Sequence, residues 1–152
     1  MAGCKCSTEA LTVKIKYHNK NLTKINKIDI GDWIDLRSAE NLEMKAGDFG
    51  FISLGISVQV PAGHEMHIAP RSGTFKNFGI IQTNSVGVLD ESYNGDTDVV
   101  KMPVLAMRDT TIKFNDRICQ FRLIPKQKPI NFIEVESLGN EARGGLGSTG
   151  VK

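Results

Sequence analysis

The stretch FGFISLGISVQVPAGHEMHIA, residues 49–69, decides the fold class. Apolar and polar residues alternate in it over short runs, which is typical of half-buried β-strands. Pro61, Ala62 and Gly63 interrupt the alternation, as a turn between two strands does. The stretch therefore predicts strands up to residue 60 and a returning strand over residues 64–69.

The same pattern continues on both sides of this stretch. Upstream, Val13, Ile15 and Tyr17 lie two residues apart and share one predicted face. Helical periodicity is weak, and only residues 72–77, after Pro70, suit a short helix or helical turn. The sequence therefore predicts one all-β domain, with further strands over residues 79–83, 97–100, 104–107, 110–114, 118–124 and 132–136.

Length and charge limit the kinds of partner. The 152 residues suit one domain, and 19 Lys and Arg against 17 Asp and Glu give a net charge of +2. No long basic block is present, so we expect no direct binding to nucleic acid or to a membrane surface, and a small-molecule partner instead. No apolar run approaches the roughly 20 residues of a membrane span, and no signal-peptide pattern precedes the domain, so we expect a cytoplasmic protein.

The cysteines form an odd and sparse set. Cys4, Cys6 and Cys119 do not suit a disulfide framework and indicate a reducing compartment, with Cys119 as a core thiol. A zinc site at Cys4 and Cys6 is disfavoured, because no further ligands stand at suitable spacings.

The two ends of the chain differ from its middle. Residues 1–10 are expected to be a flexible leader, and residues 11–139 the β domain. Four glycines among residues 143–150 leave too little apolar surface to fold alone, so residues 140–152 are expected to form a flexible C-terminal arm.

Two segments suit phosphate binding. Glycines 144–150 can present backbone N–H groups beside Ser148 and Thr149, although a plain flexible tail is the commoner meaning of such a composition. Arg71 can clamp phosphate oxygens, Ser72 can donate, and Gly73 lets the backbone approach closely. A turn with an exposed ion pair is the alternative for this second segment.

Two further segments suit recognition and chemistry. Residues 84–96 combine a hairpin-like turn with Asp90, which can take a proton from water, and Tyr93, whose ring offers a flat face to a sugar. The alternatives are a turn-capping carboxylate and a core ring. Asp35 could hold a hydrated Mg²⁺, because this ion keeps several waters and uses few carboxylates, or it could be merely structural.

Taken in order, five segments resemble the five motifs of the trimeric dUTPase family, of bacterial or phage type. The resemblance covers residues 33–150, and five ordered patterns are far more specific than any one of them. The matching segments are DLRSA at residues 35–39, PRSG at 70–73, GVLDESYNG at 87–95, DRICQ at 116–120 and GGLGSTG at 144–150.

The resemblance implies a fold and an assembly. The expected fold is a distorted jelly-roll of the β-clip type, and the expected assembly is a homotrimer. Each active site would lie between subunits and would be closed by a C-terminal arm from a neighbour.

The resemblance also implies substrate contacts. The hairpin after Asn84, which includes Gly87, would recognise uracil through backbone hydrogen bonds and leave no room for a thymine methyl group, and Tyr93 would pack on the deoxyribose. The residues implied to bind the phosphate chain are Arg71, Ser72, Gly73, Gln120, Ser148 and Thr149.

The implied reaction is hydrolysis of dUTP to dUMP and pyrophosphate. Asp90 would activate a water for attack on the α-phosphorus, while Mg²⁺, held through water by Asp35, and Arg71 stabilise the added charge. Such an enzyme limits uracil incorporation into DNA and supplies dUMP for thymidylate synthesis.

Two positions depart from the family pattern. The fifth motif usually carries an aromatic residue that stacks on uracil, and here that position is Leu146. The usual arginine position holds Glu141, whereas this chain offers Arg143 for the arm contact.

Two rival functions remain open at this point. A dCTP deaminase resembles dUTPases in fold and keeps an Arg-Ser phosphate motif, but the Asp90 segment and the glycine-rich arm disfavour it. A non-catalytic binding module need not retain Asp90, Arg71 and Tyr93 together. A regulatory protein partner is compatible with either outcome, and the sequence carries no signal for one.

Overall fold

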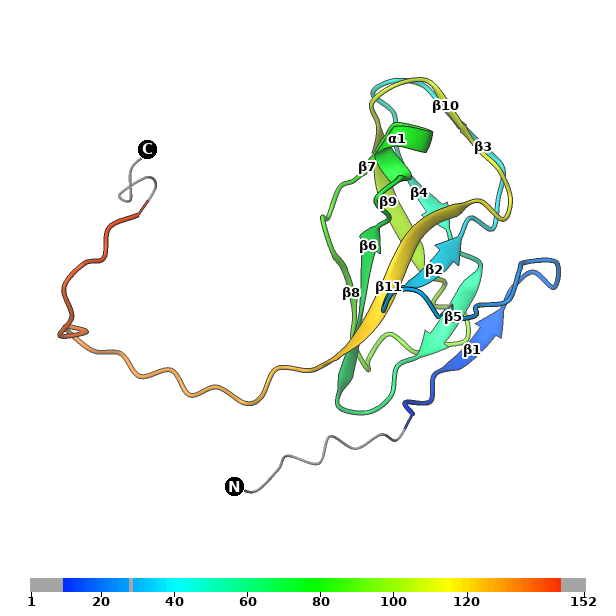
Figure 1. The fold of residues 1–152 in the computed structure, drawn as a ribbon. Coiled ribbons are helices and arrows are strands. Elements are labelled where there is room, and N and C mark those ends of the chain that lie inside the picture. The colour runs from blue at the N-terminus through cyan, green and yellow to red at the C-terminus, as the bar shows by residue number, and fades with distance from the viewer. Residues whose placement is uncertain (1–9, 28, 146–152) are drawn as a thin grey trace.

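The computed structural model describes residues 10–27 and 29–145, and this part of the chain is almost entirely β-structure (Figure 1). It contains eleven strands and one helix of five residues, so the all-β prediction is confirmed. The elements are β1 Lys14–Tyr17, β2 Ile34–Arg37, β3 Leu42–Met44, β4 Phe49–Ser53, β5 Ile56–Gln59, β6 His64–Pro70, α1 Thr74–Phe78, β7 Ile80–Gln82, β8 Gly87–Leu89, β9 Lys101–Ala106, β10 Thr110–Ile112 and β11 Arg117–Pro125.

The strands pair in four antiparallel sheets. The largest has the order β2-β11-β6-β8, so β2 and β8 form its opposite edges, and a second sheet has the order β4-β9-β7. Two-stranded sheets join β1 to β5 and β3 to β10. Alternate residues of these strands point inward and form one hydrophobic core, because side chains in a strand alternate between its faces.

The strand predictions over residues 97–100 and 104–107 are partly wrong. A single strand, β9, covers residues 101–106, with Met102, Val104 and Ala106 buried. Val100 is also buried, but its backbone hydrogen bonds do not belong to a strand ladder. Its N–H donates to the carbonyl of Ile56, and its carbonyl accepts from the N–H of Leu54. The two adjacent valines made residues 97–100 resemble a strand, although Val100 is the only buried one of the four.

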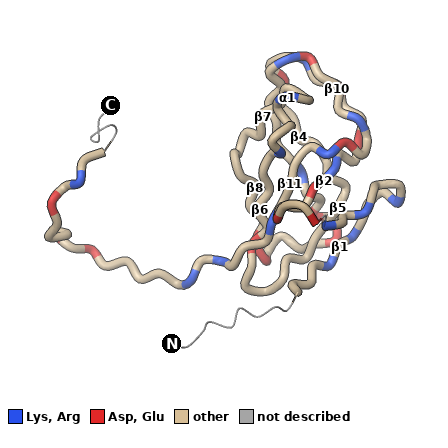
Figure 2. Tube along the Cα trace, in the orientation of Figure 1, with Lys and Arg blue, Asp and Glu red and all other residues tan. Residues whose placement is uncertain are grey.

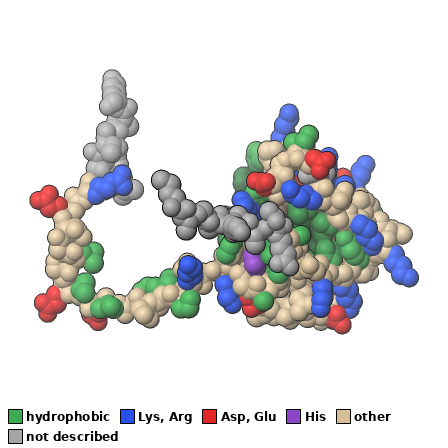
Figure 3. Space-filling model, turned by 60° about the horizontal axis from the view of Figure 1, so that its bottom comes forward, with side chains coloured by type: hydrophobic (Ala, Val, Ile, Leu, Met, Phe, Trp, Pro, Cys, Tyr) green, Lys and Arg blue, Asp and Glu red, His purple; other side chains and the backbone are tan. Residues whose placement is uncertain are grey.

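The predicted strand over residues 132–136 is wrong for the single chain. Residues 126–145, here called the extended segment, contain no helix or strand and run away from the body (Figures 1 and 3). Phe132 and Ile133 are 89% and 83% exposed. A strand needs a pairing partner, and this segment pairs with none of the strands in residues 10–27 and 29–145. The domain boundary after residue 139 stays a prediction.

The outer side of the β4-β9-β7 sheet is apolar. Phe49 pairs with Leu105, which also pairs with Ile81, so these three side chains share one face. Phe51 and Pro103 form the next pair, and the rings of Phe49 and Phe51 meet edge to face with centroids 5.3 Å apart. Phe49 and Phe51 are each 58% exposed. We call these five residues the apolar face, since clustered exposed apolar side chains mark an interaction surface.

Basic and acidic residues both occur over the body and the extended segment (Figure 2). The described residues up to 27 are an exception, because they contain five lysines and no Asp or Glu. Within the described residues, no helix is long and apolar enough to cross a lipid bilayer.

Candidate active site

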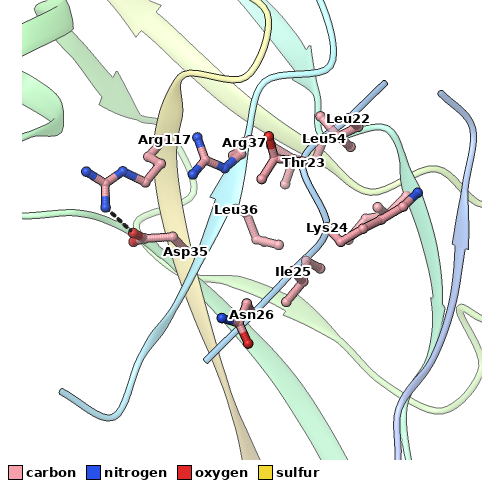
Figure 4. A pocket seen from close by; sticks show the side chains of 11 residues that line it. Leu22, Thr23, Lys24, Ile25, Asn26, Asp35, Leu36, Arg37, Leu54 and Arg117 are labelled. Carbon is pink, nitrogen blue, oxygen red and sulfur yellow. Dashed lines mark hydrogen bonds and ion pairs between the residues drawn. The ribbon is translucent and has the colours of Figure 1, made fainter. Parts of the chain in front are cut away.

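The first part of the site lies where β2, β11 and β6 pass side by side. The register places Asp35 opposite Gln120, and Gln120 opposite Ala69, just before Arg71. Arg71 Nε donates to Asp35 Oδ1 at 2.7 Å, and Arg117 Nη1 donates to Asp35 Oδ2 at 3.2 Å (Figure 4 shows the second pair). We call Asp35, Arg71, Arg117 and Gln120 the phosphate cluster.

The turn that carries Arg71 is fastened to β11. The buried Thr74 hydroxyl donates to the carbonyl of Ile118 at 2.8 Å and accepts from the N–H of Arg71 at 2.9 Å. Gln120 Nε2 donates to the carbonyl of Pro70 at 3.1 Å. Ser72 and Gly73 lie in this turn, with Ser72 exposed. These bonds hold the predicted phosphate-binding turn in one position.

Arg117 was given no role by the sequence analysis. Its side chain lines a pocket of about 240 Å³ together with Asp35 and Arg37, with residues 22–26 opposite (Figure 4). Its pairing depends on the β-bulge that breaks the β2–β11 register between Arg117 and Cys119. A bulge of this kind leaves no mark in a single sequence, so the contact could not be found there.

The second part of the site is a pocket of about 540 Å³ at β8. It brings together four predicted residues, Asn84, Gly87, Asp90 and Tyr93. Phe51 and Pro103 of the apolar face line its rim. A turn bends the chain between β7 and β8, with Ser85 at a φ of 56° and its N–H donating to the carbonyl of Gln82. We call this hollow the base pocket.

Asp90 is held in its charged form. Both the backbone N–H and the hydroxyl of Ser92 donate to Asp90 Oδ1. These bonds, the one from the hydroxyl first, lower the pKa of the Asp90 carboxyl below its ordinary value. Asp90 therefore caps a turn and remains an exposed carboxylate at neutral pH, a state in which it can accept a proton from water.

Tyr93 lies at the mouth of the base pocket and is not a core ring. Its hydroxyl donates to the carbonyl of Val99 at 3.1 Å, and the residue is 39% exposed. A ring anchored at its polar end presents a fixed apolar face to whatever enters the pocket.

Glu91 is a second residue that the sequence analysis missed. Its carboxylate accepts from the backbone N–H of Gly63 and from Lys126 Nζ, the latter at 3.1 Å. The bond from Gly63 is the main cause that lowers the pKa of Glu91, followed by that from Lys126. Lys126 begins the extended segment, so Glu91 joins the Asp90 loop to the start of that segment.

The two parts of the site lie far apart in one chain. Leu89 pairs with Met66, so Asp90 lies near Glu65 at the start of β6, whereas Arg71 follows the end of β6. The six steps from residue 65 to residue 71 span roughly 20 Å of extended chain. Arg71 also turns toward Asp35 on β2, at the sheet edge opposite β8. Asp90 and Arg71 of the same chain therefore do not reach the same phosphate group.

The described residues offer few ligands for a metal ion. They contain no group of three or more His, Cys, Asp or Glu side chains placed to hold an ion. The oxygens of Asp35 each accept from one arginine, which leaves further lone pairs for a hydrated ion. The donor set therefore suits Mg²⁺ that is bound mainly by water and by substrate phosphates.

The remaining predicted residues belong to the C-terminal end. Arg143 is exposed and lies in the extended segment, away from both parts of the site. Ser148, Thr149 and Leu146 lie outside the described residues, so their predicted roles stay predictions.

Comparison with known proteins gives three findings. The family model described as dUTPase matches residues 33–150, most of the chain. The SPbeta prophage-derived deoxyuridine 5'-triphosphate nucleotidohydrolase of Bacillus subtilis strain 168 is 54% identical over 142 residues, covering 93% of this chain and 100% of that protein. The dUTPase of Staphylococcus bacteriophage 80alpha, solved with dUPNHPP, superimposes with a TM-score of 0.77 at 18% identity, over 92% of this chain and 99% of that one.

A further structural neighbour is a mutant dUTPase from phage phi11 of S. aureus, solved with a coordinated structural Mg(II) ion. It superimposes with a TM-score of 0.71 at 15% identity, over 84% of this chain and 98% of that chain. At these identities the two superpositions establish a shared fold.

Proposed function

The chain belongs to the dUTPase family and is a dUTP diphosphatase, and we propose that it hydrolyses dUTP to dUMP and pyrophosphate with Asp90 as the general base. The base pocket takes uracil, and Tyr93 packs on the deoxyribose. The carboxylate of Asp90 orients a water and accepts its proton as the water attacks the α-phosphorus. Family membership sets aside both the dCTP deaminase and the non-catalytic module.

The phosphate cluster binds the leaving pyrophosphate. Arg71 offers a fork of N–H donors to the phosphate oxygens, and Gln120, Ser72 and the backbone at Gly73 add further contacts. When bound, Mg²⁺ neutralises charge on the triphosphate, with Asp35 as its contact through water. Asp35 holds Arg71 in position through a hydrogen bond, so Asp35 contributes to phosphate binding even without contacting a phosphate itself.

The observation that carries this proposal is the distance between Asp90 and Arg71 in one chain. A nucleotide can meet both groups only if they come from different copies of the chain. Each active site therefore lies between subunits, with the base pocket from one copy and the phosphate cluster from another.

The apolar face supports self-association into a trimer. Phe51 and Pro103 belong both to this face and to the rim of the base pocket. A second copy that covers the apolar face therefore also approaches the mouth of the pocket. Burying the face removes exposed apolar surface from water, which stabilises the assembly by roughly 25 cal/mol per Å² of apolar surface buried.

The C-terminal arm closes the site. The extended segment leaves the body at Lys126, which contacts Glu91 beside Asp90. Residues 140–152 then bring Arg143, Ser148 and Thr149 to the phosphates of a site on a neighbouring copy and exclude bulk water. With Leu146 at the position of the usual aromatic residue, stacking on the uracil is weaker or comes from another residue.

The reaction limits uracil incorporation into DNA and supplies dUMP for thymidylate synthesis. We place it in the cytoplasm, where the buried free thiol of Cys119 stays reduced.

Mixing two inactive variants tests the shared site. Asp90→Asn lacks the base and Arg71→Ala lacks the phosphate clamp, so each alone is inactive. Co-refolded at equal amounts, they should recover about a quarter of wild-type pyrophosphate release, because about one interface in four then combines an intact Asp90 with an intact Arg71.

The control mixes Asp90→Asn with Tyr93→Ala. Both residues lie in the same base pocket, so no interface regains a complete pocket and activity should stay low. Equal recovery in both mixtures, or none in the first, would contradict a site shared between copies.

A further inference from the structure

Gln82 of β7 is a buried polar residue behind the base pocket. It is 4% exposed, and its Nε2 group donates to the carbonyl of Ile68 at 3.0 Å and to Oδ1 of Asn84 at 2.9 Å. Its Oε1 atom is buried and has no hydrogen-bond partner among the described residues. Buried polar groups are usually satisfied, so this arrangement requires a reason.

The carbonyl of Ile68 fixes how the Gln82 amide is turned. A carbonyl oxygen can only accept, so the Gln82 atom that faces it must be the nitrogen. The reverse orientation would set two oxygens against each other and bury an unpaired amide nitrogen instead. Gln82 therefore has one orientation, which leaves Oε1 as the unpaired atom.

The same logic then fixes Asn84. The second N–H of Gln82 requires an acceptor, so Asn84 must turn its Oδ1 toward Gln82. Its Nδ2 group is left on the other side, 3.6 Å from where a Cβ atom on Gly87 would stand. Asn84 and Gly87 both line the base pocket, and within the described part of the chain Asn84 Nδ2 donates no hydrogen bond.

We propose that Gln82 is a positioning residue that fixes the Asn84 amide with its N–H donors toward the base, so that the pocket selects a 4-carbonyl over a 4-amino group. The inference rests on the proposed function of the base pocket. Uracil and cytosine share the carbonyl at position 2 and differ in the group at position 4. An N–H group that cannot turn around donates to the 4-carbonyl of uracil but faces another donor in the 4-amino group of cytosine.

The first test is Gln82→Leu, which keeps the volume of the side chain and removes both of its hydrogen bonds. The Asn84 amide can then turn either way. We expect the ratio of kcat/KM for dUTP over dCTP to fall about fivefold to tenfold, the value of one neutral hydrogen bond. KM for dUTP should rise while kcat changes little, because the base lies away from the reacting phosphorus.

The control tests Gln82→Leu a second time, in a protein that also carries Asn84→Asp. A carboxylate has two equivalent oxygens and needs no residue to orient it, and it accepts where the amide donates. This variant should shift the ratio toward dCTP. Adding Gln82→Leu to it should leave the ratio unchanged, whereas a merely structural role of Gln82 would alter both backgrounds alike.

The orientation can also be measured in the unaltered protein, should Gln82→Leu fail to fold. Nuclear Overhauser contacts between the Asn84 side-chain amide protons and the Gly87 α-protons are expected in the free enzyme. Their absence overturns the inference, as does an equal loss of dUTP and dCTP turnover in Gln82→Leu. A wild-type enzyme that leaves dUTP intact would instead reject the proposed function.

Discussion

The base pocket and the phosphate cluster occupy opposite edges of one sheet and differ in how far a single chain completes them. In the phosphate cluster the charged groups are already paired, since Asp35 binds two arginines, and the Ile118 carbonyl and the Gln120 side chain of β11 hold the turn at Arg71. In the base pocket, Asp90 and Asn84 line an open hollow beside an exposed apolar face.

The difference indicates which part adapts during binding. Paired charges keep their geometry without ligand, so the phosphate cluster is organised before dUTP arrives. The base pocket is open on one side, and under the proposed function a neighbouring copy and the arm would supply the missing wall. The following predictions test this contrast, beginning with the largest effect.

Asp90→Asn should have the largest effect. The amide cannot accept a proton from water, so kcat should fall roughly a thousandfold while dUTP still binds. Steady-state kinetics and calorimetric titration with a non-hydrolysable analogue measure the two effects. Asp96→Asn is the control, because Asp96 lies in the same loop and its side chain is 88% exposed and pairs with Lys16. Near-normal turnover in Asp90→Asn would contradict the proposal that Asp90 is the general base.

Truncation after Gly139 should come next. Loss of the arm leaves the site open to water, so kcat should fall roughly a hundredfold. Since the core lies before residue 126, the truncated protein should remain a folded trimer by sedimentation. Unchanged kinetics would mean that the neighbour's body alone completes the pocket.

Asp35→Asn tests the preorganised cluster. The amide can accept from one arginine but repels the second donor, so KM should rise about tenfold and the free energy of unfolding should fall by roughly 1–3 kcal/mol. The Mg²⁺ concentration at half-maximal rate should also rise. Asp109→Asn is the control, because the Lys45–Asp109 pair is exposed and should contribute little to stability. Equal effects in both variants would argue against a special role for Asp35.

Ser92→Ala should have the smallest effect. The ionised form of Asp90 is the active one, so activity is present above the Asp90 pKa and is lost as pH falls through it. Ser92 lowers this pKa, so removing its hydroxyl raises it. The acid limb of the kcat/KM profile should therefore move to higher pH, with the plateau at neutral pH little changed. A shift to lower pH would contradict the assigned base.

Local sequence patterns were enough to predict most of the strands and the helix. Residues 49–69 alternate as β4, β5 and β6 do, and the turn signals at Pro61 to Gly63 separate the last two strands. The short helix expected over residues 72–77 is α1, shifted by two residues at its start and one at its end. These features depend on neighbouring residues, so the sequence was enough to predict them.

Contacts between residues far apart in the chain could not be predicted from the sequence. Residues 132–136 have the composition of a strand, but no other strand of the described residues pairs with them. The roles of Arg117 and Gln82 depend on contacts with Asp35 and Ile68, which the pairing of distant strands creates. The site residues at Asn84, Gly87, Asp90 and Tyr93 were found by motif and do share one pocket, whereas the separation from Arg71 depends on the length of β6.

That strand also acts as a spacer. The seven residues of β6 bury Met66 and Ile68 on one side. Inserting one residue without a β-bulge would turn the following side chains to the opposite side, so in the absence of a bulge the strand changes length in steps of two residues, about 7 Å. In the proposed architecture, the span between the pyrimidine end of one site and the triphosphate end of the next therefore changes in steps of this size unless a bulge takes up the extra residue.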